Sequence, residues 1–94
     1  MAIQSFQDKA TAAIFLGLPA RTIPPDLRRR ALAKLQQLHA ASKLDDLRVP
    51  PSNRLEALQG ERFGQHSIRI NSQWRVCFHW SGSDADNVEI VDYH

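Results

Sequence analysis

The side chains best suited to chemistry in this sequence are Arg75 and the last three residues, Asp92, Tyr93 and His94. Histidine exchanges protons near neutral pH, and arginine binds phosphate oxygens through two parallel hydrogen bonds. Cleavage of RNA without a metal needs both abilities. The 2′-hydroxyl loses a proton and attacks the adjacent phosphorus, the 5′-oxygen leaves with a proton, and the charge that develops on the phosphoryl group must be stabilised. These four residue types suit that reaction.

A purely structural interpretation of the same residues stays open on the sequence alone. Chain ends commonly fray, so His94 can be a loose end, Tyr93 a packing residue and Asp92 a solvated acid. The β-branched run Val88–Val91 can hold the end in a sheet. Regular alternation along that strand would put Asp92 and His94 on one side and Tyr93 on the other. If all three face one RNA, we expect the strand to break near Asp92.

Metal and nucleotide sites have little support in the residue pattern. The four histidines are not paired at the spacing of helical metal ligands, and only Cys77 and His79 lie two apart. Zinc sites need three or four convergent ligands. No glycine-rich loop precedes a helix, as nucleotide-phosphate sites require. We therefore expect neither a metal nor a cofactor, and we expect Cys77 to be a small packing residue.

Length and composition predict one globular domain over residues 1–94, with 43% hydrophobic and 23% charged residues. The longest apolar stretch, Ala12–Leu18, is far shorter than the roughly 20 residues of a membrane-spanning helix. The first ten residues lack the cationic start of a secretion signal. The single cysteine cannot form an internal disulfide, which agrees with a reducing compartment. A cytoplasmic location is expected.

Charge is unevenly distributed along the chain. All 12 Lys and Arg residues lie in residues 1–80, whereas residues 81–94 contain only acidic charges. Such an excess of cations suits a phosphate-rich partner. A basic surface that water merely solvates is an equally good interpretation of charge alone.

Helix signals come first along the chain and strand signals follow. The alternating Ile3–Phe6 predicts a short edge strand, and Asp8 suits the N-cap of a helix over Ala10–Leu16. Leu27, Ala31, Leu35 and Leu38 recur at helical spacing and predict a second helix over 27–41. The segment 42–53 is a linker with one possible helical turn.

Strand signals fill the second half of the chain. The predicted strands cover Arg54–Leu58, His66–Ile70, Trp74–Trp80 and Val88–Tyr93, with turns at 71–73 and 81–87. The short turns between them predict an antiparallel meander. The expected fold class is therefore α+β, with a short N-terminal strand and two helices on one face of the sheet. Trp74, Val76, Phe78 and Trp80 would face the helices, and Arg75, Cys77 and His79 would line the uncovered face.

Four motifs resemble a known family when taken together. "RLEALQG", "SIRIN", "QWRVCF" and the terminal "VDYH" are similar to motifs of the HigB toxins of bacterial type II toxin-antitoxin pairs, within the RelE superfamily, and the likeness extends over residues 2–94. The resemblance implies a RelE-like α+β endoribonuclease. Such an enzyme enters the A site of the small ribosomal subunit, cuts the mRNA without a metal and stops translation.

The resemblance also assigns roles to single residues. The catalytic arginine of the family falls on Arg75, and its C-terminal Asp, Tyr and His fall on Asp92, Tyr93 and His94. Arg75 would stabilise the scissile phosphate, His94 would transfer a proton, Tyr93 would orient the RNA and Asp92 would fix the geometry. Where some members carry a histidine in the strand before the glycine, this chain has Glu56, either as a structural residue or as a base.

Partners follow from the resemblance as well. It implies a HigA-like helix-turn-helix antitoxin, which neutralises the toxin, and it implies contact with ribosomal RNA. The cations available for that contact are Arg28, Arg29, Arg30, Lys34, Arg54, Arg62 and Arg69.

Two alternatives belong to other classes of function. A toxin of the same fold can lack nuclease activity and inhibit DNA gyrase, as the ParE branch does. A weakly active relative can also be retained for its contact with the antitoxin, and Glu56 keeps that interpretation open.

Overall fold

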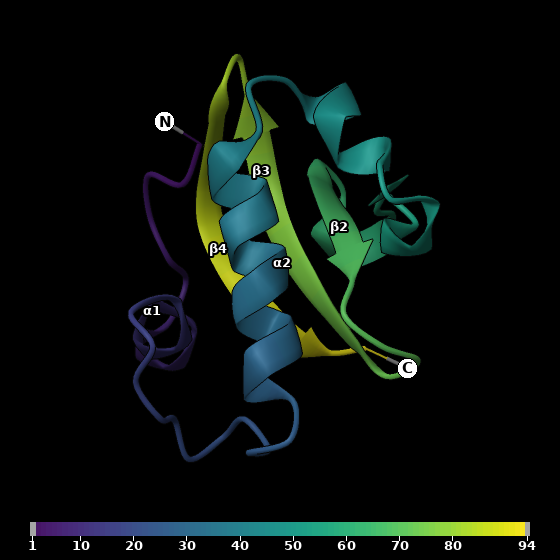
Figure 1. Cartoon of the computed structure of the whole chain (residues 1–94). Helices are drawn as coiled ribbons and strands as arrows, with labels where there is room; N and C mark the ends of the chain where they lie inside the picture. The colour runs from purple at the N-terminus through teal and green to yellow at the C-terminus, as the bar shows by residue number, and fades with distance from the viewer. Residues whose placement is uncertain (1, 94) are drawn as a thin grey trace.

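The computed structural model describes residues 2–93 and consists of two helices followed by one sheet (Figure 1). The helices are α1 (Lys9–Phe15) and α2 (Arg28–Ala40), followed by the 3-10 turns η1 (Leu44–Arg48) and η2 (Pro51–Asn53). The strands are β1 (Glu56–Ala57), β2 (Gln65–Arg69), β3 (Trp74–Ser81) and β4 (Asp84–Asp92), with the turn η3 (Gly60–Arg62) between β1 and β2. The predicted α+β class, with helices before strands, is confirmed.

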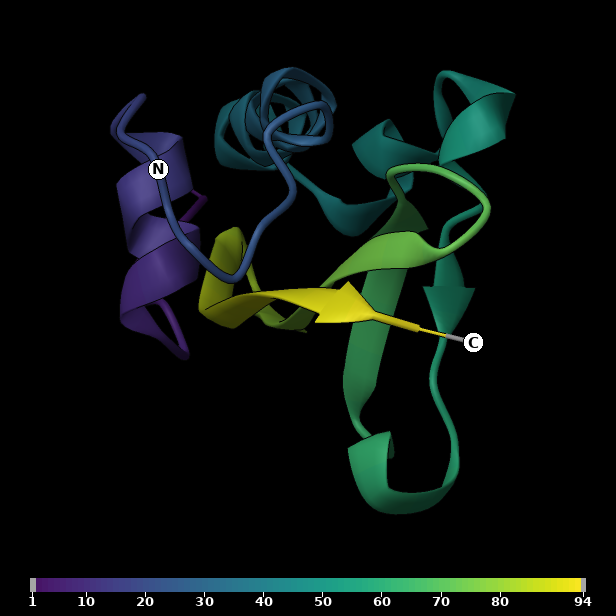
Figure 2. The same ribbon diagram turned by 90° about the horizontal axis from the view of Figure 1, so that it is seen from below.

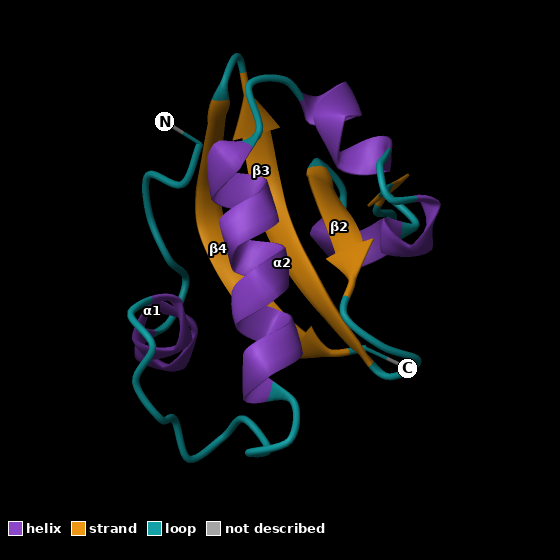
Figure 3. Ribbon diagram, in the orientation of Figure 1, coloured by secondary structure: helices purple, strands orange, loops and turns teal. Residues whose placement is uncertain are grey.

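The sheet is an antiparallel meander in chain order, β1-β2-β3-β4 (Figure 3). Helix α2 packs across one face of it, and α1 packs against α2 and β4 (Figure 2). The apolar stripe of α2 is confirmed, since Ala31, Leu35 and Leu38 are all fully buried. They meet Val76 and Phe78 of β3, which are also fully buried, in the core.

The predicted N-terminal strand over Ile3–Phe6 is wrong. In the described part of that segment only two isolated parallel bridges form, Ile3 with Ala85 and Phe6 with Val88. The reason lies in β4, the strand that the segment would join. Its pairing with β3 shifts register between the pair Cys77–Glu89 and the pair His79–Asp86. A bulge of this kind bends a strand and interrupts its ladder. The N-terminal segment therefore bridges β4 at Ala85 and at Val88 but does not pair continuously between them.

Two strand boundaries also differ from the prediction. Strand β1 is limited to two residues, because Arg54 adopts a left-handed backbone (φ 46°) at the end of η2. Strand β4 begins at Asp84, inside the predicted turn 81–87, because Ser81 pairs with Asp84 across a two-residue connection. Gly82 has a φ of 64° there, which a tight hairpin connection requires.

Helix α1 begins as predicted, with Asp8 as its N-cap. The Asp8 carboxylate accepts a hydrogen bond from the Thr11 backbone N–H at 2.7 Å. We expect Asp8→Ala to lower the free energy of unfolding by about 1 kcal/mol, because the cap is lost. Urea unfolding measures this, and Asp8→Asn, which can still cap, is the matched control. Equal losses in both variants would contradict the capping role.

Candidate active site

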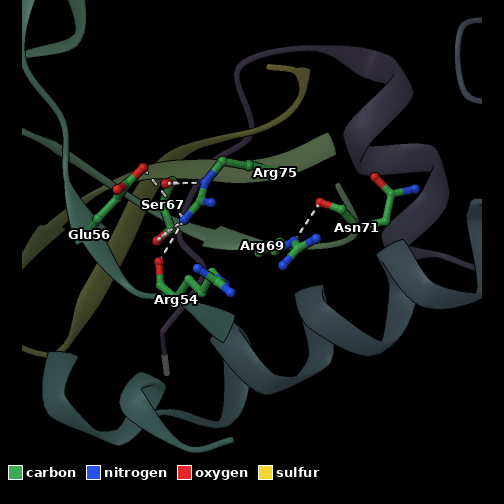
Figure 4. Close-up of polar contacts among 6 residues, drawn as sticks. All are labelled: Arg54, Glu56, Ser67, Arg69, Asn71 and Arg75. Atoms are coloured by element: carbon green, nitrogen blue, oxygen red, sulfur yellow. Dashed lines mark hydrogen bonds and ion pairs between the residues drawn. The ribbon is translucent and has the colours of Figure 1, made fainter. Parts of the chain in front are cut away.

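The guanidinium of Arg75 is held in place by two other residues, Ser67 and Arg54 (Figure 4). Its Nε donates to Ser67 Oγ at 2.7 Å, and its Nη2 donates to the backbone carbonyl of Arg54 at 2.6 Å. The side chain is only 11% exposed. Nη1 takes part in none of these contacts, so it is the guanidinium nitrogen that a phosphate oxygen could use.

Glu56 lies next to this arginine. Its Oε1 is 3.7 Å from Arg75 Nη2, and its side chain is 51% exposed. The contact follows from register, since Glu56 pairs with Ser67, the residue that holds Arg75. The structure thus brings together a cation and a carboxylate on the sheet face away from α2.

The C-terminal residues form a second cluster around Gln73. Strand β4 ends at Asp92, while His94 lies outside the described residues, so the predicted break that would turn all three residues to one side stays a prediction. Gln73 Nε2 donates to both Asp92 carboxylate oxygens at 3.1 Å, and the Tyr93 N–H donates to the Gln73 carbonyl at 2.7 Å. The chain therefore stays attached to the β2–β3 turn after the strand has ended.

Register decides how the two clusters face each other. Arg75 pairs with Val91, and Trp74 pairs with Asp92. Paired residues share a face of the sheet, so Asp92 begins on the α2 face and Arg75 on the opposite face. Tyr93, one residue beyond the strand, is 37% exposed.

Gln73 was missed by sequence reasoning, which treated 71–73 as a turn and nothing more. The signal was Asn71, a typical turn residue whose side chain can hold nearby backbone groups. Asn71 Oδ1 accepts hydrogen bonds from the N–H groups of Gln73 and Trp74, both at 2.8 Å. A turn fixed in this way orients the side chains within it, and that of Gln73 reaches the Asp92 carboxylate.

The predicted RNA-binding cations differ in their surroundings. Arg62 forms an ion pair with Glu89 at 3.2 Å, and Arg28 donates to the carbonyls of Ala20 and Ile23. Lys34 donates to Asn53 Oδ1 at 2.6 Å, and Arg69 donates to the carbonyl of Asn71 at 2.9 Å. The other predicted cations are Arg29, Arg30 and Arg54.

The face that carries Arg75 is less open than predicted. Cys77 lies on that face, yet it is fully buried, as is Ser67. Burial raises the pKa of the Cys77 thiol to about 11. A thiol with that pKa stays protonated at neutral pH and is a poor nucleophile, so the predicted packing role fits.

The described residues offer neither a metal site nor a membrane-spanning helix. Within residues 2–93, no three His, Cys, Asp or Glu side chains lie close enough together to bind a metal ion. Over the same residues, neither helix has the length and apolar character that crossing a membrane requires.

Comparison with known proteins gives the family. Residues 4–94 match the HigB-like toxin family, described as the RelE-like toxin of the type II toxin-antitoxin system HigB. Toxin HigB-1 of Vibrio cholerae is 45% identical over 67 residues, which cover 71% of this chain and 70% of that protein. Endoribonuclease HigB of Proteus vulgaris is 29% identical over 97 residues, which cover 98% of this chain and 99% of that protein. The chain therefore belongs to the HigB-like family of RelE-like type II toxins.

Proposed function

We propose that this protein is an endoribonuclease that cuts mRNA in the A site of the small ribosomal subunit and thereby stops translation. The observation that supports this most directly is Arg75, whose guanidinium is held by Ser67 and Arg54 while Nη1 is left for a phosphate. A relative in the same family is named Endoribonuclease HigB. A held arginine of this kind suits a reaction in which negative charge develops on a phosphoryl group.

The proposed reaction is a transfer within the RNA strand. The 2′-oxygen bonds to phosphorus while the bond to the 5′-oxygen breaks, which gives a 2′,3′-cyclic phosphate and a 5′-hydroxyl. Either Glu56 or His94 takes the proton of the 2′-hydroxyl, and the other group protonates the 5′-oxygen. Arg75 neutralises the phosphoryl oxygens throughout. Proton transfer by a positioned side chain contributes about 10²–10⁴-fold to rates of this kind.

Asp92 and Tyr93 have positioning roles in this proposal. The bidentate contact of Gln73 with Asp92 holds the end of β4, and the backbone bond of Tyr93 extends that hold by one residue. The exposed ring of Tyr93 is then suited to orient a base or ribose of the mRNA by stacking.

A type II toxin has a cognate antitoxin as its partner. We propose that the partner here is a HigA-like helix-turn-helix protein that neutralises the toxin and represses their shared operon. Action on translating ribosomes places the proposed activity in the cytoplasm.

The experiment that tests this function uses purified ribosomes programmed with a short mRNA. We expect cuts within the A-site codon that leave 2′,3′-cyclic phosphate ends, and no cuts in the same mRNA without ribosomes. A parallel supercoiling assay with DNA gyrase tests the class of toxin. Gyrase inhibition with intact mRNA would contradict the proposed nuclease and favour the ParE-like alternative.

A further inference from the structure

A small polar pocket lies where α2 approaches the end of β2. It has a volume of about 200 Å³ and is lined by Arg30, Lys34, Ser52, Arg69 and Ile70. Three of these five residues are cations, and none is acidic. Among residues 2–93, none of the three cations takes part in an ion pair. The pocket is therefore a concentration of positive charge without a counter-charge.

Two of the cations are held in position by neutral groups. Lys34 Nζ donates to Asn53 Oδ1 at 2.6 Å, and the amide nitrogen of the fully buried Asn53 donates to the carbonyl of Leu47 at 3.1 Å. Arg69 Nε donates to the carbonyl of Asn71 at 2.9 Å (Figure 4), which leaves both of its Nη groups for a ligand. The donors are thus arranged before any ligand arrives.

This arrangement has an electrostatic cost in the free protein. Burial and, secondarily, the nearby positive charge of Arg30 lower the pKa of Lys34 below its usual value. A bound anion would offset both effects, because it would pair with the ammonium group and screen it from Arg30.

The pocket also lies close to the candidate active site in the sheet. Arg69 and Arg75 are direct cross-strand partners on β2 and β3. Side chains at such positions begin about 5 Å apart on the same face, here the one away from α2. Arg69 is the last residue of β2, and its side chain nevertheless lines the pocket together with Arg30 and Lys34 of α2. Arg69 donates to the Asn71 carbonyl and lines the pocket, whereas Arg75 donates to Ser67 and Arg54. The pocket and the candidate active site are therefore neighbours.

We propose that this pocket binds one backbone phosphate of the substrate RNA, close in the strand to the phosphate that Arg75 holds. The proposal rests on the proposed nuclease function. Pockets for whole small molecules have volumes of about 300–1,000 Å³, so this smaller one suits a phosphate group better than a nucleotide. Lysine and arginine donors without acidic neighbours match that ligand.

The test measures binding to ribosomes programmed with a short mRNA in which fluorine replaces every 2′-hydroxyl, so that it cannot be cut. A series of such strands carries one uncharged methylphosphonate linkage at successive positions. We expect one linkage besides the scissile one to weaken binding to the wild-type protein about tenfold or more. The same linkage should have no effect on Arg69→Gln, which already lacks the contact.

Two further variants complete the experiment. Lys34→Gln should behave like Arg69→Gln, and in both the slope of log affinity against log salt should fall by about 0.7, the value for one phosphate on a single strand. Arg21→Gln, which removes an exposed cation outside the pocket, is the matched control and should keep the wild-type pattern. Thermal unfolding of each variant identifies any loss of folding, and Arg69→Gln tests the proposal even if Lys34→Gln is unstable.

The outcomes separate this proposal from the proposed nuclease function. Wild-type cleavage on the ribosome with no linkage sensitive to Arg69→Gln would overturn the pocket and leave the nuclease intact. A sensitive linkage without any cleavage would support the pocket and overturn the nuclease. If the variants weaken binding to empty ribosomes as much as to programmed ones and no linkage is sensitive, the phosphate belongs to ribosomal RNA, and the assignment to the substrate is wrong.

Discussion

Arg75→Ala is expected to slow mRNA cleavage on programmed ribosomes by about 10²–10³-fold, the usual effect of losing one group that stabilises transition-state charge. The guanidinium is held by a hydroxyl and a carbonyl, and its free Nη1 can meet a phosphoryl oxygen. Single-turnover cleavage at saturating protein measures this effect on the chemical step alone. Unchanged cleavage would remove Arg75 from the reaction.

Two control variants make the Arg75 result specific. Arg75→Lys keeps the charge but cannot contact Ser67, Arg54 and a phosphate at once, so we expect it to restore only a small part of the rate. Arg48→Ala removes an exposed cation that pairs with the neighbouring Asp45, and this variant should cut at the wild-type rate. Equal losses in Arg75→Ala and Arg48→Ala would point to a general charge effect.

The helices and the central strand could be predicted from the sequence because their signals are local. The stripe of α2 repeats at helical spacing, and β3 alternates over its whole length. Asp8 is a capping residue at the right position before α1. In each case the residues that decide the structure lie within a few positions of one another, so local pattern and tertiary packing agree.

The N-terminal segment and β4 could not be predicted because distant residues decide their structure. The alternation of Ile3–Phe6 is typical of a strand, yet continuous pairing depends on whether its neighbour is regular. That neighbour is β4, whose pairing with β3 shifts register opposite Cys77 and His79. Asn87, with a φ of 53°, lies in the same stretch of β4 and was predicted to be part of a turn.

The candidate site shows the same division. Motifs single out Arg75, but nothing local indicates that the carbonyl of Arg54 will receive its guanidinium, because the two residues are 21 positions apart. The contact needs the left-handed backbone of Arg54 and the pairing of β1 with β2. Gln73 could not be identified either, because its contact with Asp92 depends on the pairing of β3 with β4.

Removal of His94 is expected to lower the cleavage rate by about 10²–10⁴-fold while the shortened protein still folds. The rate should fall because a group that moves a proton is lost. The residues that hold the end of β4, Gln73, Asp92 and the backbone of Tyr93, remain in the shortened protein. Urea unfolding and ribosomal cleavage of a protein ending at Tyr93 measure the two quantities.

Truncation also moves the terminal carboxylate by one residue, so a full-length variant must accompany it. His94→Gln keeps the chain length and a side chain of similar reach but cannot exchange a proton near neutral pH. If proton transfer is the role of His94, His94→Gln and the truncated protein lose activity to the same extent. Wild-type cleavage by His94→Gln would exclude proton transfer by His94, and Glu56 would then be the remaining candidate base, beside the guanidinium it already contacts.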